Sequence, residues 1–228
     1  MKKVNEVSYA GLAELFVKEM LDLQERKDGD LYVGLSGGST LPPLLSAIAA
    51  TENADKLSQV VFTFIDERLV PYDADGSNYG AMKEAIESLS LRALPLPCED
   101  SAEAAVAYQQ KISGSDLPSL DLLLLGYGDD GHLASLFPGS AELDLPCSGD
   151  KWLFRATASY EPKERWSWGM EALTNSAKTF CLYKGAADGS KAQRLDEALN
   201  DENCDTPLKR FLADVKGEVS FYICQKAF

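Results

Sequence analysis

Two kinds of hydrophobic pattern follow one another along the chain. Between about Ser8 and Arg26, apolar residues recur at helical spacing among charged ones, which predicts an amphipathic helix. Short apolar runs bounded by Gly, Pro or Asp predict buried strands over Leu31–Leu35, Val60–Ile65, Leu120–Leu125, Trp152–Ala156, Thr179–Tyr183 and Val219–Cys224. Further helices are predicted over Pro42–Ala50, Tyr79–Ser90, Ala102–Ile112, Ser190–Leu199 and Pro207–Leu212, and a long polar loop over Asp66–Asn78.

Strands and helices alternate throughout the chain, which is typical of α/β proteins. The pattern predicts a single doubly wound, largely parallel sheet of the Rossmann-like kind, with helices on both faces. No Pro/Gly/Ser-rich linker interrupts it, and 228 residues suffice for one large domain with a substantial core. We therefore expect residues 1–228 to form one domain.

The composition argues against several classes of protein. The net charge of −14 and the pI of about 4.5 disfavour a nucleic-acid partner, because phosphate backbones need a positive footprint. Residues 1–6 lack the apolar core of a signal peptide, and no apolar stretch approaches the ~20 residues that span a bilayer. We expect a cytoplasmic protein without a membrane partner. The five cysteines lack CxxC spacing, which predicts reduced thiols rather than disulfides or a zinc site.

A Gly- and Ser-rich loop follows the first predicted strand and precedes a helix. Its backbone N–H groups, its hydroxyls and the positive end of the helix dipole suit a phosphate, with candidate contacts from Ser36, Gly37, Gly38, Ser39 and Thr40. The same letters satisfy G-x-S-x-G, the nucleophile elbow of α/β-hydrolases, with Ser36 as nucleophile. We favour the phosphate cradle because a hydrolase elbow normally follows several strands. A structural turn without a ligand is a third interpretation.

The chain has one histidine, His132, in the glycine-rich stretch Gly126–Gly139 that follows an apolar strand. An imidazole at the carboxyl end of a strand in an open α/β sheet is the best candidate for proton transfer near neutral pH, although a lone histidine is often structural. The stretch also fits the dinucleotide pattern G-x-G-x-x-G. Asp129 and Asp130 would place carboxylates where a pyrophosphate should bind, and Pro138 leaves little room for the next helix, so we reject that interpretation.

Charged residues near other predicted strand ends supply further candidates. Asp66-Glu-Arg68 follows the second strand, where Asp66 could handle a proton and Arg68 could clamp an anion, since Arg presents a rigid fork to phosphate or carboxylate. A surface salt-bridge cluster is the alternative. Arg165 and Lys191 are less distinctive, because a single Arg or Lys usually points into solvent.

Taken together, these blocks resemble the 6-phosphogluconolactonases of the glucosamine-6-phosphate isomerase/deaminase-like superfamily. The matching pieces are Leu35-Ser-Gly-Gly-Ser-Thr40, Asp66-Glu-Arg68 with Val70-Pro71 and Ser77-Asn-Tyr-Gly80, Leu124-Leu-Gly126 and Asp130-Gly-His-Leu-Ala-Ser-Leu-Phe-Pro-Gly139. Beyond Gly139 the match rests on Pro162, Glu164-Arg165 and Lys191-Ala192. The chain departs from the family at Leu133, where Thr is usual, and in the length of the loop before Lys191. No acid stands between His132 and Gly139, which favours the lactonase branch over the deaminase branch.

The resemblance implies hydrolysis of 6-phospho-D-glucono-1,5-lactone to 6-phosphogluconate in the oxidative pentose phosphate pathway. His132 would activate water and protonate the leaving ring oxygen, and Asp130 would orient its ring. Phosphate contacts are expected from Ser39, Thr40, Arg165 and Lys191, with Arg68 facing the phosphate or the oxyanion. The resemblance implies no cofactor and no metal, and we expect a monomer or weak homodimer.

Two other functions compete with this one. A serine hydrolase would use Ser36 with His132 and an intervening Asp, which stand in the right chain order. A sugar-phosphate-binding regulatory module would share the fold without turnover. The joint presence of His132, Asp130 and Arg68, and the absence of an appended DNA-binding segment, argue against the regulatory module.

Overall fold

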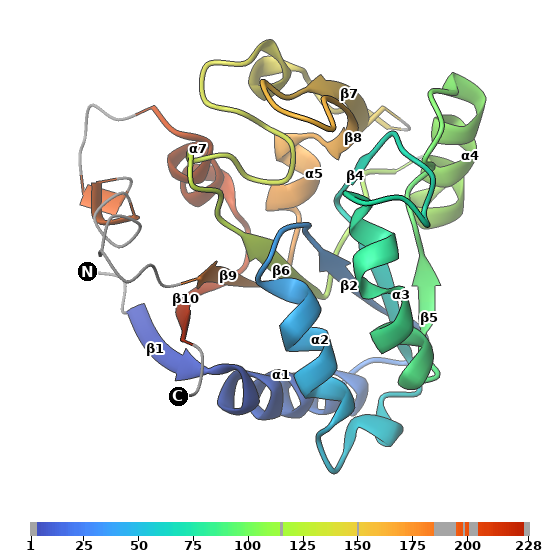
Figure 1. Cartoon of the computed structure of the whole chain (residues 1–228), viewed down its shortest axis with the longest axis vertical. Helices are drawn as coiled ribbons and strands as arrows, with labels where there is room; N and C mark the ends of the chain where they lie inside the picture. The colour runs from blue at the N-terminus through green and yellow to red at the C-terminus, as the bar shows by residue number, and fades with distance from the viewer. Residues whose placement is uncertain are drawn as a thin grey trace.

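The computed structural model describes residues 4–114, 116–149, 151–184, 195–197, 199–200 and 205–225. Its main sheet has seven parallel strands in the order β1-β10-β9-β6-β2-β3-β5 (Figure 1). They are β1 (Val4–Ser8), β2 (Leu31–Leu35), β3 (Val60–Phe64), β5 (Arg92–Leu94), β6 (Leu122–Gly126), β9 (Lys178–Lys184) and β10 (Glu218–Gln225). The five interior strands are those that the sequence predicts, and the predicted α/β fold with a largely parallel sheet is confirmed. The two unpredicted strands, β1 and β5, form the edges.

Helices cover both faces of the main sheet, as predicted. They are α1 (Tyr9–Gln24), α2 (Leu41–Ala49), α3 (Asn78–Ser88), α4 (Ala102–Ser113), α5 (Met170–Thr174) and α7 (Pro207–Asp214), with short 3-10 turns η1 (Ala54–Lys56) and η2 (Ala141–Asp144). Right-handed crossovers place α1, α2 and α3 on one face and α4, α5 and α7 on the other. The predicted helix over Ser190–Leu199 lies largely outside the described residues. None of the helices in the described part of the chain combines the length and apolar character that crossing a bilayer requires.

Hydroxyl side chains begin several of these helices. Ser8, Ser77, Ser101 and Thr206 each accept a hydrogen bond from the backbone N–H three residues later. Such N-caps satisfy N–H groups that have no partner within the helix, so these residue types fix where each helix starts. The sequence signal for the helix starts is therefore local, which explains why the predicted and observed starts agree within one residue for α1, α3 and α4.

A second, three-stranded antiparallel sheet corrects the expectation of a single sheet. Its order is β4 (Asp66–Arg68), β8 (Glu164–Trp168) and β7 (Leu153–Thr157). In Figure 1, β7 and β8 lie at the top of the molecule and α1 lies at the bottom. The predicted strand at Trp152–Ala156 belongs to this small sheet, and part of the predicted polar loop is β4. Pairing with β8, which is distant in sequence, creates β4, so no local hydrophobic pattern marks it.

The core forms where the interior strands meet the helices. Leu122 to Leu125 have no exposed surface, and every residue of β3 is buried. Phe16 of α1 packs edge-on against Phe180 of β9, with ring centroids 6.0 Å apart. Near-continuous apolar runs of this kind are typical of parallel strands covered on both faces. Cys147, Cys181 and Cys224 are buried and Cys98 is partly exposed, and Cys204 lies outside the described residues.

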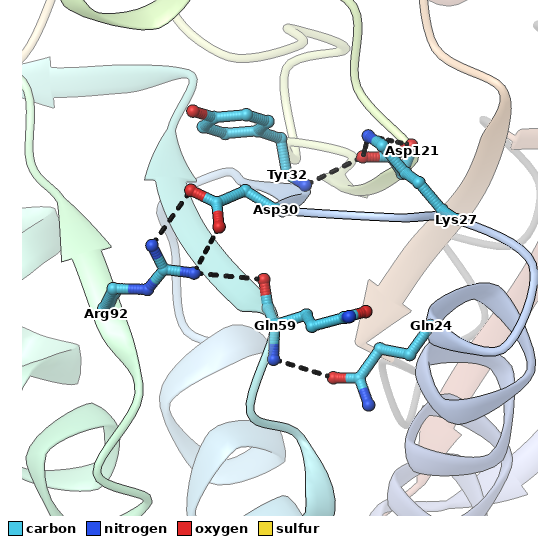
Figure 2. A network of polar contacts seen from close by, with 7 residues as sticks. All are labelled: Gln24, Lys27, Asp30, Tyr32, Gln59, Arg92 and Asp121. Carbon is cyan, nitrogen blue, oxygen red and sulfur yellow. Dashed lines mark hydrogen bonds and ion pairs between the residues drawn. The ribbon is translucent and has the colours of Figure 1, made fainter.

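At the amino ends of the strands, polar side chains join loops that are distant in sequence (Figure 2). Arg92 of β5 pairs with Asp30, just before β2, at N···O distances of 2.6 and 2.9 Å. Lys27 pairs with Asp121, just before β6, at 2.6 and 2.7 Å. Asp121 also accepts the N–H of Tyr32 at 2.8 Å. These contacts link the starts of β2, β5 and β6.

Candidate functional site

The topology places a crevice at the carboxyl ends of β2 and β6. These strands are neighbours, but the chain continues from β2 toward β3 and from β6 toward β9, on opposite sides. Ligands of open α/β sheets bind at such a switch point. A cavity of about 190 Å³ lies there, lined by Ser36, Gly37, Gly38, Ser39, Thr40, Asp66, Arg68, Gly126, Tyr127, Gly128, Asp129, His132, Ala134, Tyr160 and Lys184.

The predicted cradle forms one wall of this cavity, and its helix end is open. Gly38 has a φ of +94°, a conformation that favours glycine, and it lets the chain turn from β2 into α2. Pro42 and Pro43 occupy the first turn of α2, and the side chain of Thr40 makes no capping hydrogen bond. The hydroxyl of Thr40 and the nearby backbone N–H groups can therefore serve an external acceptor.

Ser36 has contacts that differ from those of a catalytic nucleophile. Its Oγ accepts the N–H of Gly126 at 2.7 Å and donates to the carbonyl of Gly37 at 3.4 Å. No hydrogen bond between Ser36 and His132 occurs among the described residues, and Ser36 is not in the strained φ > 0 region. The hydroxyl joins the ends of β2 and β6, so the geometry disfavours the serine-hydrolase interpretation.

His132 lies in the cavity and is oriented by Asp130. The imidazole Nδ1 contacts Oδ1 of Asp130, and the same oxygen accepts the backbone N–H of His132 at 3.3 Å. Burial on its own would raise the pKa of Asp130, but the hydrogen bond and charge of His132 outweigh it and lower that pKa. An ionised Asp130 favours the tautomer that carries the proton on Nδ1, which leaves Nε2 free to accept one.

Asp66 is buried and uses both carboxylate oxygens in hydrogen bonds. Oδ1 accepts the N–H of Gly37 at 3.1 Å, and Oδ2 accepts the hydroxyl of Ser135 at 2.9 Å. Gly37 belongs to the cradle, and Ser135 follows His132 in the adjacent loop. Asp66 therefore ties the two walls of the cavity together. These contacts suit a positioning residue better than the proton handler that the sequence suggested.

Glu67, between Asp66 and Arg68, is fully buried and holds the start of α3. It accepts the backbone N–H groups of Arg68 and Asn78 at 2.7 Å and that of Tyr79 at 2.8 Å. Burial raises the pKa of Glu67, although these three hydrogen bonds act in the opposite direction. The amide of Asn78 then donates to the carbonyl of Asp66 at 2.8 Å, so Glu67 supports the cavity wall from behind.

Two arginines lie side by side on the small sheet, in register on β4 and β8. Arg68 lines the cavity and donates to the carbonyl of Gly76 at 2.6 Å, while its buried Nε has no hydrogen-bond partner in the described part of the chain. Arg165 is fully buried behind the cavity wall, and its guanidinium lies over the rings of Phe137 and Tyr160, 5.6 and 5.0 Å from their centroids. Burial, and then the charge of Arg68, lowers the pKa of Arg165, and its Nη2 lacks a hydrogen-bond partner among the residues that the structure describes. Two adjacent cations with unused donors attract an anion.

The cavity is lined by residues that the sequence did not indicate, and one predicted site residue cannot be placed. Lys191 lies outside the described residues. Among the added lining residues are Tyr160, from the β7–β8 connection, and Lys184, the last residue of β9. Lys184 could have been found from its place, because the carboxyl end of a predicted parallel strand points toward the ligand edge. Tyr160 gave no such signal, since its position depends on the unpredicted pairing of β7 with β8.

Comparisons with known proteins agree with this geometry. A family profile described as glucosamine-6-phosphate isomerases/6-phosphogluconolactonase matches residues 5–221. The chain is 32% identical to a bovine 6-phosphogluconolactonase over 96% of this chain and 87% of the relative, and 35% identical to a human one over 85% and 78%. The crystal structure of a 6-phosphogluconolactonase from Thermotoga maritima superposes with a TM-score of 0.81 at 25% identity, covering 99% of this chain and 100% of the other. The chain therefore belongs to the glucosamine-6-phosphate isomerase/6-phosphogluconolactonase family.

Proposed function

We propose that the chain hydrolyses 6-phospho-D-glucono-1,5-lactone to 6-phosphogluconate, as the names of its relatives indicate. One observation carries the proposal beyond the family. The imidazole of His132, the cradle Ser36–Thr40 and the guanidinium of Arg68 line the same cavity. A base and an anion site in one cavity are what a phosphorylated lactone requires. We place this reaction in the oxidative pentose phosphate pathway of the cytoplasm, in a single lactonase domain that acts as a monomer or weak homodimer.

His132 starts the reaction by activating water. Its Nε2 accepts a proton from a water molecule while the oxygen attacks C1 of the lactone, so that a C–O bond forms and the carbonyl electrons move onto oxygen. The imidazole becomes a cation, which the ionised Asp130 stabilises through Nδ1. Asp130 thereby lowers the barrier to attack by water and stays ionised throughout.

The tetrahedral intermediate then collapses and opens the ring. The negative oxygen at C1 re-forms the carbonyl, the bond from C1 to the ring oxygen breaks, and Nε2 of His132 returns its proton to that oxygen. Arg68 lies in the cavity with a buried N–H that no described residue accepts, so it can stabilise the oxyanion or bind the phosphate. The acid product then loses its own proton to solvent.

Phosphate binding orients the substrate at a distance from the reacting carbon. We propose contacts from Ser39 and Thr40 of the cradle and from Lys191, with Arg165 reinforcing the positive potential from behind the wall. Energy from this remote contact holds the lactone carbonyl beside the imidazole. Glucono-1,5-lactone without phosphate should therefore react poorly.

Acid release from freshly generated 6-phosphogluconolactone, with spontaneous hydrolysis subtracted, tests the proposal. We expect His132→Ala to lower the catalysed rate by about 10²-fold or more. If His132→Ala retains the wild-type rate, the general-base role is wrong. If the wild-type protein binds 6-phosphogluconate without accelerating hydrolysis, a regulatory module replaces the enzyme. Ser36→Ala is the matched control, because it tests the competing serine-hydrolase mechanism. Full loss of activity in this variant, together with fluorophosphonate labelling of Ser36 in the wild-type protein, would favour the serine hydrolase instead.

A further inference from the structure

Strand β9 carries a lysine at each end, and the two have different surroundings. Lys178, at the amino end, pairs with Glu19 at 2.6 Å and with Glu218 at 3.8 Å. Lys184, at the carboxyl end, lines the cavity and is half-buried. Its side chain makes no ion pair or hydrogen bond with any residue in the described ranges. Within the described residues, this ammonium therefore has no ion-pair partner, and it lines a cavity where an anionic substrate would bind.

The sheet order places Lys184 opposite the cradle. Strands β9 and β2 flank β6, so their axes are two strand spacings apart, about 10 Å, and by the register of the three strands Lys184 extends about three residues further along the sheet than Ser36. Between them β6 ends in Gly126, which lines the cavity without a side chain. Ser36 pins the N–H of Gly126, which keeps this part of the floor in place. A phosphate above Gly126 is within reach of cradle donors on one side and of the long Lys184 side chain on the other.

The cations around the cavity support the same position for the anion, and the carboxylate of Asp129 also belongs to the lining. Arg68 stands on the side of β3, and Lys184 stands on the side of β9, so cations flank the cradle from both directions. The carboxylate of Asp66 is occupied by Gly37 and Ser135. Lysine is a compact charge with three donors and binds phosphate well.

We propose that Lys184 is a further substrate-binding residue that contacts the phosphate of the sugar lactone. This inference rests on the proposed function, because it names a contact within the same site. Lys184 acts on binding, and its ammonium favours a doubly charged phosphate ester over a neutral sugar. The proton transfers at His132 do not involve it.

Calorimetric titration of the wild-type chain, Lys184→Met, Lys184→Arg and Lys178→Met with 6-phosphogluconate and with gluconate tests the contact without any turnover. We expect Lys184→Met to weaken 6-phosphogluconate binding by about 10- to 100-fold, the effect of one charged hydrogen bond, with Lys184→Arg retaining most of the affinity. Binding of gluconate should not change. Lys178→Met is the matched control from the same strand, and it should lower the melting temperature without altering affinity.

Kinetics with the phosphorylated lactone give a second measurement. Lys184→Met should raise KM by the same 10- to 100-fold and leave kcat within a few-fold of wild type. Unchanged 6-phosphogluconate affinity in Lys184→Met, equal losses for 6-phosphogluconate and gluconate, or no binding of 6-phosphogluconate by the wild-type chain would each overturn the inference. If the wild-type chain binds 6-phosphogluconate through Lys184 but does not hydrolyse the lactone, the proposed function fails and the contact stands.

Discussion

Replacing Gly128 by alanine places one methyl group against the imidazole of His132. A Cβ built on Gly128 overlaps the Cε1, Nδ1 and Cγ atoms of the ring. The φ of Gly128 lies outside the left-handed region, so alanine fits the backbone there without strain. The substitution therefore tests the position of the imidazole while the fold around it is kept.

The magnitude follows from the size of that overlap. The ring must retreat by about 1 Å to reach ordinary van der Waals contact with the new methyl group, and a misplacement of about 1 Å can cost about 10²-fold in rate. The same retreat disturbs the contact between Nδ1 and Asp130. We expect kcat for the phosphorylated lactone to fall by about 100-fold. KM should change little, because the cradle and Arg68 are not moved.

The assay is the acid-release measurement on freshly generated lactone, accompanied by thermal unfolding of each variant. Gly139→Ala is the matched control in the same loop, since its Cβ meets no atom within 4 Å while its φ of +73° is strained for alanine. It should lower stability by about 1 kcal/mol and keep the rate. Wild-type kcat in a folded Gly128→Ala variant would refute the reasoning, because the imidazole would then work from a different place.

Three further predictions concern stability and pH. Glu67→Ala leaves three backbone N–H groups, that of Asn78 buried and those of Arg68 and Tyr79 partly buried, without their acceptor. It should lower the free energy of unfolding in urea by about 3 kcal/mol, and a loss below about 1 kcal/mol would contradict the role of Glu67. Ser90 has a φ of +53° just after α3, and the N–H of the next residue, Leu91, donates to the carbonyl of Ile86 at 3.4 Å. Glycine adopts this conformation without strain, so Ser90→Gly should raise the melting temperature by about 2–4 °C. An unchanged melting temperature would show that the backbone at Ser90 is not strained. The pKa of Asp130 is lowered in the folded chain, so ionised Asp130 stabilises the fold above its unfolded pKa, and this contribution is lost as pH falls through its folded pKa. Asp130→Asn should therefore be less stable than wild type near pH 7 and equally stable at strongly acid pH. A difference in unfolding free energy that persists in acid would disprove this linkage.

Local patterns predicted the interior of the fold because the forces that shape it are local or strongly apolar. The five interior strands are buried runs, and the hydroxyl caps mark helix starts. The edge strand β5 (Arg92–Leu94) is short and partly exposed, so its pairing with β3 leaves no hydrophobic pattern. The charged strand β8 (Glu164–Trp168) likewise depends on partners far away in sequence.

In the candidate site, too, one part could be predicted from the sequence and another could not. The strand-end rule predicted that the cradle, Arg68 and His132 would share one edge, and they line one cavity. The hydrogen-bond and packing partners of each side chain could not be predicted from the sequence. That Asp66 uses both oxygens on Gly37 and Ser135 depends on contacts with residues 29 and 69 positions away in the chain. That the guanidinium of Arg165 packs against the ring of Phe137 likewise depends on a distant segment.

The ion pairs of Figure 2 lie at the end of the sheet opposite the cavity. Two ion pairs, Arg92 with Asp30 and Lys27 with Asp121, join the loops at the amino ends of the strands, while the cavity opens at the carboxyl ends. A five-residue strand such as β2 sets these edges about 16 Å apart. That distance exceeds the Debye length of about 8 Å at physiological ionic strength, so the solvent-exposed charges of the amino edge have little influence on a substrate at the carboxyl edge.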